Sequence, residues 1–136
     1  MALLNRNQIL EAKDIKTKDI EVHEWGGTIR IKQLSAKEYN DITMNMVNIR
    51  KMAAKQLSSK KNSDENLEDA INELAIKNQK ILLIIKSVVD ENMKPLFTEA
   101  DMELLYQKNT NVIDRIIAEI EEFNAVSSED AKKNLD

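Results

Sequence analysis

Turn-forming residues are scarce in this chain of 136 residues, and their scarcity limits the folds that it can adopt. The two glycines are adjacent, at Gly26 and Gly27, and the only proline is Pro95. A domain built entirely from β-strands needs many tight turns, and glycine and proline are among the residues that most often form them. The sequence therefore predicts long helices joined by few loops, around a single core of the size that one domain can bury.

Apolar and polar residues alternate on both sides of the glycine pair, which predicts a β-hairpin with a two-residue turn. In this register Val22 lies opposite Ile31, and Glu21 lies opposite Lys32 as a charge pair. A hairpin of this size is not stable alone, so we expect it to pack on helices. The apolar side chains that share its core face are Ile20, Val22, Ile29 and Ile31.

Apolar residues at helical spacing follow the hairpin and predict a mainly α (α+β) fold. The hairpin, at residues 19–33, is expected to pack on a small bundle of about four to five helices. Val88 and Val89 are also compatible with a strand, because both are β-branched and precede a turn. Residues 1–126 are expected to form the compact domain, and residues 127–136 a flexible C-terminal tail. Helices after the hairpin are predicted at about residues 36–57, 65–88, 99–107 and 111–125.

Local signals mark two helix starts and one corner of the chain. Ser35 and Glu38 have the spacing of a capping box, in which each side chain bonds the backbone N–H of the other residue. Thr98 and Asp101 have the same spacing. Pro95 lies in a polar segment after the most apolar run of the chain, and it cannot continue a helix. We therefore expect the chain to reverse direction between residues 88 and 98.

The residue types that enzymes and metal sites commonly use are few. The chain has no cysteine, which excludes disulfides, thiolate catalysis and cysteine-bound metals. His23 is the only histidine, so a histidine metal site or a catalytic triad has no second member. The acidic pairs lie where helix capping or solubility explains them. We therefore expect a protein that is not an enzyme and has no cofactor or metal.

Charge and hydropathy limit the partners as well. A net charge of −4 and a pI near 5.2 argue against general nucleic-acid binding. The most apolar run, residues 81–85, is too short to span a bilayer, and the N-terminus lacks the apolar stretch of a signal peptide. We expect a soluble protein with no membrane partner. The densest basic cluster contains no aromatic residue that could stack on a single strand, and consists of Arg50, Lys51, Lys55, Lys60 and Lys61.

The residues that stand out for a binding role are a tryptophan and the methionines. Trp25 is the only tryptophan and is expected at the hairpin tip, on the face away from the aliphatic residues. It either packs on the N-terminal segment or a helix, or anchors a partner, because tryptophan is enriched among residues that dominate binding energy. Methionines fill cores and also form adaptable binding surfaces. The candidates for partner binding are Trp25, Met44, Met46, Met52 and Met93.

Two segments of the chain resemble a known family. Residues 21–38 read EVHEWGGTIRIKQLSAKE and are similar to the V-x-E-W-G-G-x-V-x-V-(R/K)-x-L-(S/T)-(G/A)-x-E region of tail assembly chaperones from long-tailed phages and prophages. Residues 87–101 read SVVDENMKPLFTEAD and resemble the S-x-x-D-E-x-G-x-P-L-F-(T/S)-x-x-D region of the same family. Met93 stands where glycine is usual, and His23 where proline is common. The order and spacing of both segments agree with the family over nearly the whole chain.

The resemblance implies a non-enzymatic function in the cytoplasm of the bacterial host. Chaperones of this family bind the long, helical, aggregation-prone tape-measure protein, keep it soluble, help to recruit tail-tube subunits and are absent from the mature virion. Many of their genes also produce a longer frameshifted form, and residues 131–134 (AKKN) are compatible with a slippery adenine run. Self-association through amphipathic helices is also expected. The family supplies no catalytic or ligand residues.

Two functions of other classes remain open from the sequence. The chain could be a structural virion component, such as a connector or minor tail protein. It could also be a helical DNA-binding regulator that uses the basic cluster from Arg50 to Lys61. A chaperone is expected to be missing from purified particles, and a regulator is expected to bind DNA in a salt-dependent manner.

Overall fold

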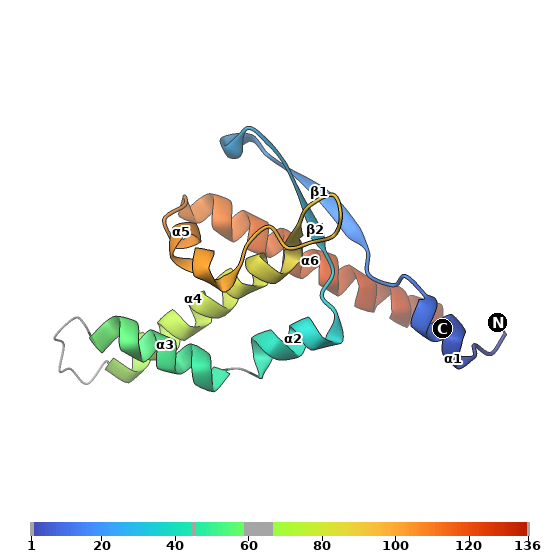
Figure 1. The fold of residues 1–136 in the computed structure, drawn as a ribbon, viewed down its shortest axis with the longest axis horizontal. Helices are drawn as coiled ribbons and strands as arrows, with labels where there is room; N and C mark the ends of the chain where they lie inside the picture. Colours follow the sequence, from blue (N-terminus) through green and yellow to red (C-terminus); the bar gives the residue numbers. More distant parts are fainter. Residues whose placement is uncertain (1, 45, 59–66, 136) are drawn as a thin grey trace.

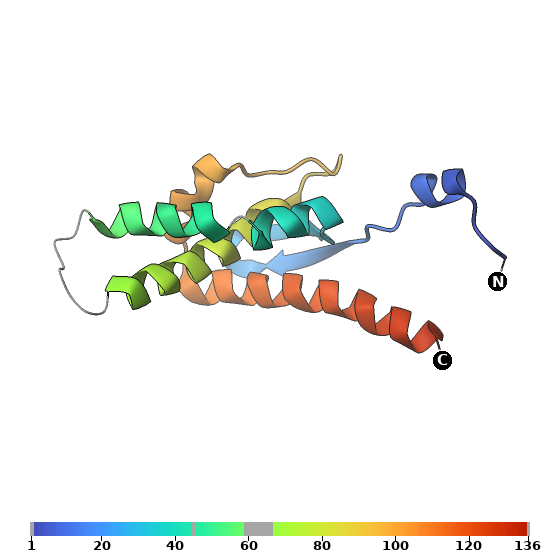
Figure 2. The same ribbon diagram turned by 90° about the horizontal axis from the view of Figure 1, so that it is seen from below.

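The structure is a computed structural model that describes residues 2–44, 46–58 and 67–135, with side chains described up to residue 125 except those of Met46 and Ser58 (Figure 1). The mainly α fold with an N-terminal hairpin is confirmed, and a short third strand extends the hairpin into a sheet of order β1-β2-β3. Of the helices, α2 to α6 form the bundle, whereas α1 stands apart from it, as Figure 2 shows. The elements are α1 Arg6–Glu11, β1 Thr17–Val22, the 3-10 turn η1 His23–Trp25, β2 Gly27–Lys32, α2 Ala36–Thr43, α3 Met46–Ser58, α4 Leu67–Ser87, β3 Val88–Val89, the 3-10 turn η2 Glu99–Asp101, α5 Met102–Tyr106 and α6 Thr110–Leu135.

Helix α4 is the centre of the bundle. It contacts α2, α3, α5, α6 and β3, and it lies between α3 and α6 (Figure 2). Ile81, Leu82, Ile84 and Ile85 are all buried, so its second half is apolar on most of its circumference. Burying one such side chain contributes about 1.5 to 3 kcal/mol, which makes this half of α4 the main source of core stability.

The hairpin differs from the prediction in its register. Val22 lies opposite Gly27, and Ile20 lies opposite Ile29, so the predicted pairs of Val22 with Ile31 and of Glu21 with Lys32 are wrong. The connection is longer than two residues, because His23 to Trp25 form a 3-10 turn before Gly26, which adopts a left-handed φ of 75°. The register is displaced by four residues, an even number. The predicted apolar face therefore still points to the core.

The region predicted as one helix at residues 36–57 forms two helices, α2 and α3. Ser35 and Glu38 form the predicted capping box at the start of α2. The Thr43 hydroxyl donates to the carbonyl of Tyr39 at 2.9 Å, a local bond that competes with the regular helix. The interruption after α2 allows Ile42 of α2 and Ile49 of α3 both to face α4, and both are buried.

Helix α6 also differs from the prediction. It was expected to end near residue 125, but it continues to Leu135. The sequence of residues 126–135 contains alanine, glutamate, lysine and leucine, which favour helices, and no glycine or proline that would end one.

The predicted corner lies between β3 and α5. Val89 bridges to Pro95, and the loop between them is closed by Asp90, whose Oδ1 accepts backbone N–H groups of Asn92 at 2.7 Å and of Lys94 at 3.0 Å. Met93 has φ 66°, a left-handed conformation that glycine adopts without strain. The Thr98 N–H donates to the carboxylate of Asp101 at 3.0 Å, which is the predicted contact at that helix start.

Candidate partner-binding surfaces

The tip of the hairpin forms an apolar surface together with the corner and α5. A shallow pocket of about 280 Å³ there is lined by Trp25, Phe97, Asp101, Leu104, Leu105 and Lys108. Trp25 is 37% exposed and Leu104 is 63% exposed, whereas Leu105 is buried beneath them. We call these six residues the hairpin-tip patch. It is an uncovered apolar surface next to one carboxylate and one ammonium group.

Two ion pairs hold the hairpin on α6 and so fix the position of Trp25. Arg115 donates to both carboxylate oxygens of Glu24, at 2.9 and 2.7 Å. Lys18 donates to Glu119 at 2.9 Å, one helical turn further along α6. The hydrogen bonds from Arg115, followed by a backbone hydrogen bond, lower the pKa of the Glu24 carboxyl to about 2. The hairpin-tip patch is thus preformed in the free protein.

The structure does not bring the predicted methionines together with Trp25. Met44 and Met52 are exposed at the α2–α3 side of the molecule, and Met93 is exposed on the corner loop. Met52 also lines a small pocket with Asn78 and the buried Met102, between α3, α4 and the start of α5. The side chain of Met46 lies outside the described residues. The three candidate methionines whose side chains are described, Met44, Met52 and Met93, are therefore not among the residues that line the pocket at the hairpin tip.

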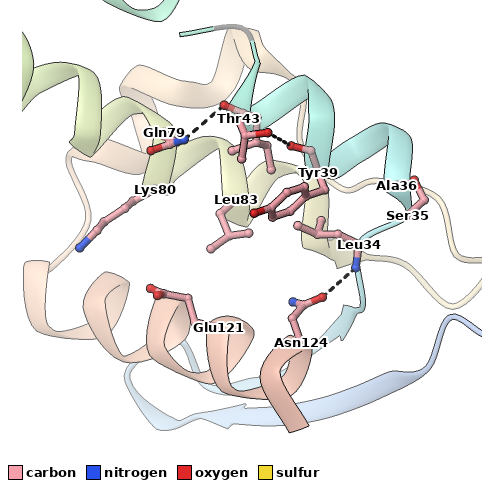
Figure 3. A pocket seen from close by; sticks show the side chains of 11 residues that line it. Leu34, Ser35, Ala36, Tyr39, Thr43, Gln79, Lys80, Leu83, Glu121 and Asn124 are labelled. Atoms are coloured by element: carbon pink, nitrogen blue, oxygen red, sulfur yellow. Dashed lines mark hydrogen bonds between the residues drawn. The ribbon is translucent and has the colours of Figure 1, made fainter. Parts of the chain in front are cut away.

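A second surface, which the sequence did not predict, is a groove between α2, α4 and α6 (Figure 3). Its volume is about 610 Å³. Tyr39 of α2 is 59% exposed, and its ring points into this groove. The α2–α4–α6 groove is lined by Leu34, Ser35, Ala36, Tyr39, Ile42, Thr43, Gln79, Lys80, Leu83, Glu121 and Asn124.

Polar contacts fix the walls of this groove. Asn124 accepts the backbone N–H of Leu34 at 3.1 Å, which ties the end of β2 to α6. Gln79 donates to the carbonyl of Ile42 at 3.3 Å, which ties α2 to α4. Lys80 and Glu121 stand on the α4 and α6 walls, on either side of the opening (Figure 3). The groove therefore combines an apolar floor with one charge of each sign at its rim.

The remaining sequence features give no further site. Arg50 of the basic cluster lies 3.9 Å from Glu68 of α4, and Lys60 and Lys61 lie outside the described residues. Within residues 2–44, 46–58 and 67–135 there is no group of three or more acidic, histidine or cysteine residues placed to hold a metal ion. In the same ranges, no helix is both long enough and apolar enough to cross a membrane.

Comparisons with known proteins give one family. The family model described as "Phage tail assembly chaperone" matches residues 5–134. Among solved structures, the tail assembly chaperone of bacteriophage HK97 has a similar fold, with a TM-score of 0.50 and 14% sequence identity. The similarity covers 84% of this chain and 88% of the HK97 chain. A comparison with curated proteins gave no match.

Proposed function

Because the chain belongs to the phage tail assembly chaperone family, we propose that it binds the tape-measure protein of its phage or prophage and keeps it soluble during tail assembly. In this proposal it acts without catalysis in the cytoplasm of the bacterial host. It also helps to recruit tail-tube subunits, with a longer frameshifted form as the link, and leaves before the virion is complete.

The observation that supports this proposal best is the hairpin-tip patch. A long helical client exposes an apolar stripe before it is packed in the tail, and such a stripe binds to preformed apolar surfaces of a partner. Trp25 offers a large, rigid ring, and the exposed side chain of Leu104 lies in the same patch. Tryptophan near the centre of an interface often contributes about 2 kcal/mol or more to binding.

The two ion pairs beneath the hairpin support the same interpretation. A loop that becomes ordered only on binding loses conformational entropy, which weakens the complex. Glu24 and Arg115 hold the tip in place in the free protein, at 2.7 and 2.9 Å. The patch is thus ready to bind, and the exposed Met93 and Met52 could add adaptable contacts to a client that passes beyond it.

The proposal is tested by co-expression of this chain with the tape-measure protein, followed by co-purification and a comparison of client solubility. We expect the wild-type chain to keep the client soluble, and Trp25→Ala and Leu104→Ala each to lower the amount of bound client about tenfold or more. Ile76→Ala is the matched control, because the exposure of Ile76 on α4 lies between those of Trp25 and Leu104 and Ile76 is not part of the patch.

Unchanged client binding by both patch variants would show that the client does not use this surface. If the wild-type chain neither solubilises nor retains the client, with or without the longer form, the chaperone proposal is wrong. Mass spectrometry of purified particles tests the last part of the proposal, because a structural component of the virion is present there and an assembly chaperone is not.

A further inference from the structure

The N-terminal arm, which we define as residues 2–16, carries apolar side chains that nothing covers. Leu3, Leu4, Ile9 and Leu10 are all exposed, and α1 has no buried residue. The arm leaves the body of the molecule, and Figure 2 shows α1 at a distance from the bundle, although the two overlap in the view of Figure 1. Lys16 anchors its base to the body, where its carbonyl accepts from the Gln33 backbone N–H at 2.9 Å and its N–H donates to the Gln33 side chain at 3.0 Å.

Helix α1 has its own start signal although it lacks a packing partner. Asn5 accepts the N–H of Gln8 at 2.9 Å, and Gln8 accepts the N–H of Asn5 at 3.0 Å, which completes a capping box. A single helix of six residues is only marginally stable in water, even with a good cap. A capped helix with uncovered leucine and isoleucine side chains is therefore suited to docking on an apolar surface.

We propose that α1 of one copy docks in the α2–α4–α6 groove of a second copy. The groove is an apolar hollow of about 610 Å³, within the range of pockets that hold several side chains. Tyr39 and Leu83 form apolar surface inside it, and Tyr39 is largely exposed in the free chain. Each copy carries both surfaces, so the contact is of the head-to-tail type, which can be repeated from copy to copy.

The charges on the two surfaces are complementary. Arg6 precedes Ile9 by three residues and Leu10 by four, so all three lie on one face of α1. Glu121 on the α6 wall of the groove forms no ion pair with any residue in the described ranges, and the same holds for Arg6. We expect Arg6 to pair with the Glu121 carboxylate when Ile9 and Leu10 face the groove floor. Glu11 is turned about 140° away from Arg6 around the helix.

The position of the arm favours docking in the groove of a second copy over docking in the groove of its own chain. Its base at Lys16 and Gln33 lies beside Leu34, at the end of the groove that Asn124 closes. From there the arm points away from the bundle, and Ala12, which follows α1, is extended, with φ −63° and ψ 132°. Entering its own groove would require the chain to reverse within residues 12–16. Entering a neighbouring groove requires no change in its direction.

Disulfide trapping tests this proposal on the purified full chain, without a client. The chain has no cysteine, so Leu10→Cys in one preparation and Tyr39→Cys in another each carry a single thiol. We expect the mixture to form a disulfide-linked dimer of the two variants under mild oxidation. Ile76→Cys replaces Tyr39→Cys as the matched control, since Ile76 is exposed but lies outside the groove, and it is expected to give little of the mixed dimer.

Charge reversal provides an independent measurement by sedimentation velocity. We expect Arg6→Glu and Glu121→Arg each to weaken self-association roughly tenfold, and a mixture of the two to recover part of it. Glu11→Lys is the control for the arm and should leave self-association unchanged. The proposal is overturned if the chain is monomeric at all concentrations, if both reversals leave association unchanged, or if a chain carrying both cysteines closes an internal disulfide while the separate variants do not cross-link.

Discussion

A buried hydrogen-bond network offers a quantitative test of the fold. Asn78 is 0% exposed in the middle of α4, and its Oδ1 accepts from the hydroxyl of Tyr106 on α5 at 2.6 Å. Its Nδ2 donates to Gln56 of α3 at 3.3 Å. One side chain thus joins three helices, and α5 carries the exposed Leu104 of the hairpin-tip patch. A buried polar group that loses its hydrogen-bond partner lowers the stability of the fold. We therefore expect removal of either Asn78 or the Tyr106 hydroxyl to destabilise the protein.

The proposed perturbation is Tyr106→Phe, which removes only the hydroxyl group. The buried Asn78 oxygen then loses its short hydrogen bond, at a cost of about 1 to 3 kcal/mol in the free energy of unfolding. Urea denaturation followed by circular dichroism measures this cost directly. Tyr39→Phe is the matched control, because Tyr39 is 59% exposed, and we expect its cost to be below about 0.5 kcal/mol.

A double-mutant cycle with Asn78→Leu separates the hydrogen bond from other effects of the substitutions. Asn78→Leu alone leaves the Tyr106 hydroxyl buried without its acceptor, whereas the double variant removes both polar groups. We therefore expect the loss of unfolding free energy in the double variant to be smaller than the sum of the two single losses by about 1 kcal/mol or more. The reasoning is refuted if Tyr106→Phe is no more costly than Tyr39→Phe and the coupling is within about 0.3 kcal/mol of zero.

Three further predictions follow from single residues. Ile116→Ala empties a fully buried position of α6 and should lower the free energy of unfolding by about 2 to 5 kcal/mol in urea denaturation; a cost below about 1 kcal/mol would contradict the described core. Met93→Gly removes the backbone strain of a side chain in the left-handed conformation and should raise the free energy of unfolding by about 0.5 to 1 kcal/mol, whereas Met93→Ala should not raise it. Because the pKa of Glu24 is lowered, its ion pair with Arg115 is intact above the ordinary pKa of 4.5 and is lost as the pH falls toward about 2. An NMR titration of the Glu24 carboxyl should therefore show a midpoint near 2, and Arg115→Gln should raise that midpoint.

Local sequence signals were sufficient for much of the fold. The capping box of Ser35 and Glu38 depends on two residues three positions apart, and the corner around Pro95 depends on a short polar segment after an apolar run. The helix after Asn109 was predicted from apolar residues at helical spacing, and five of them are buried, namely Val112, Ile113, Ile116, Ile117 and Ile120. These features are set by contacts within one or two turns of the chain, which a sequence displays directly.

Other features depended on residues far apart in the sequence. The register of the hairpin follows from a longer turn whose Glu24 pairs with Arg115, 91 positions away. The sequence identified Trp25 as a candidate anchor, but Phe97 and Leu104 join it only through the fold. The α2–α4–α6 groove is built by three separate helices and the end of β2, so no single segment carries a signal for it.

Helix α6 allows the two proposed binding surfaces to exist together. Arg115 and Glu119 lie on one side of its buried face and hold the hairpin, whereas Glu121 and Asn124 lie on the other side and line the groove. In the arrangement that we propose, an arm in the groove therefore leaves Trp25 uncovered. Copies joined from arm to groove would present several hairpin-tip patches to one long client, and contacts that are weak singly would add up through effective concentration.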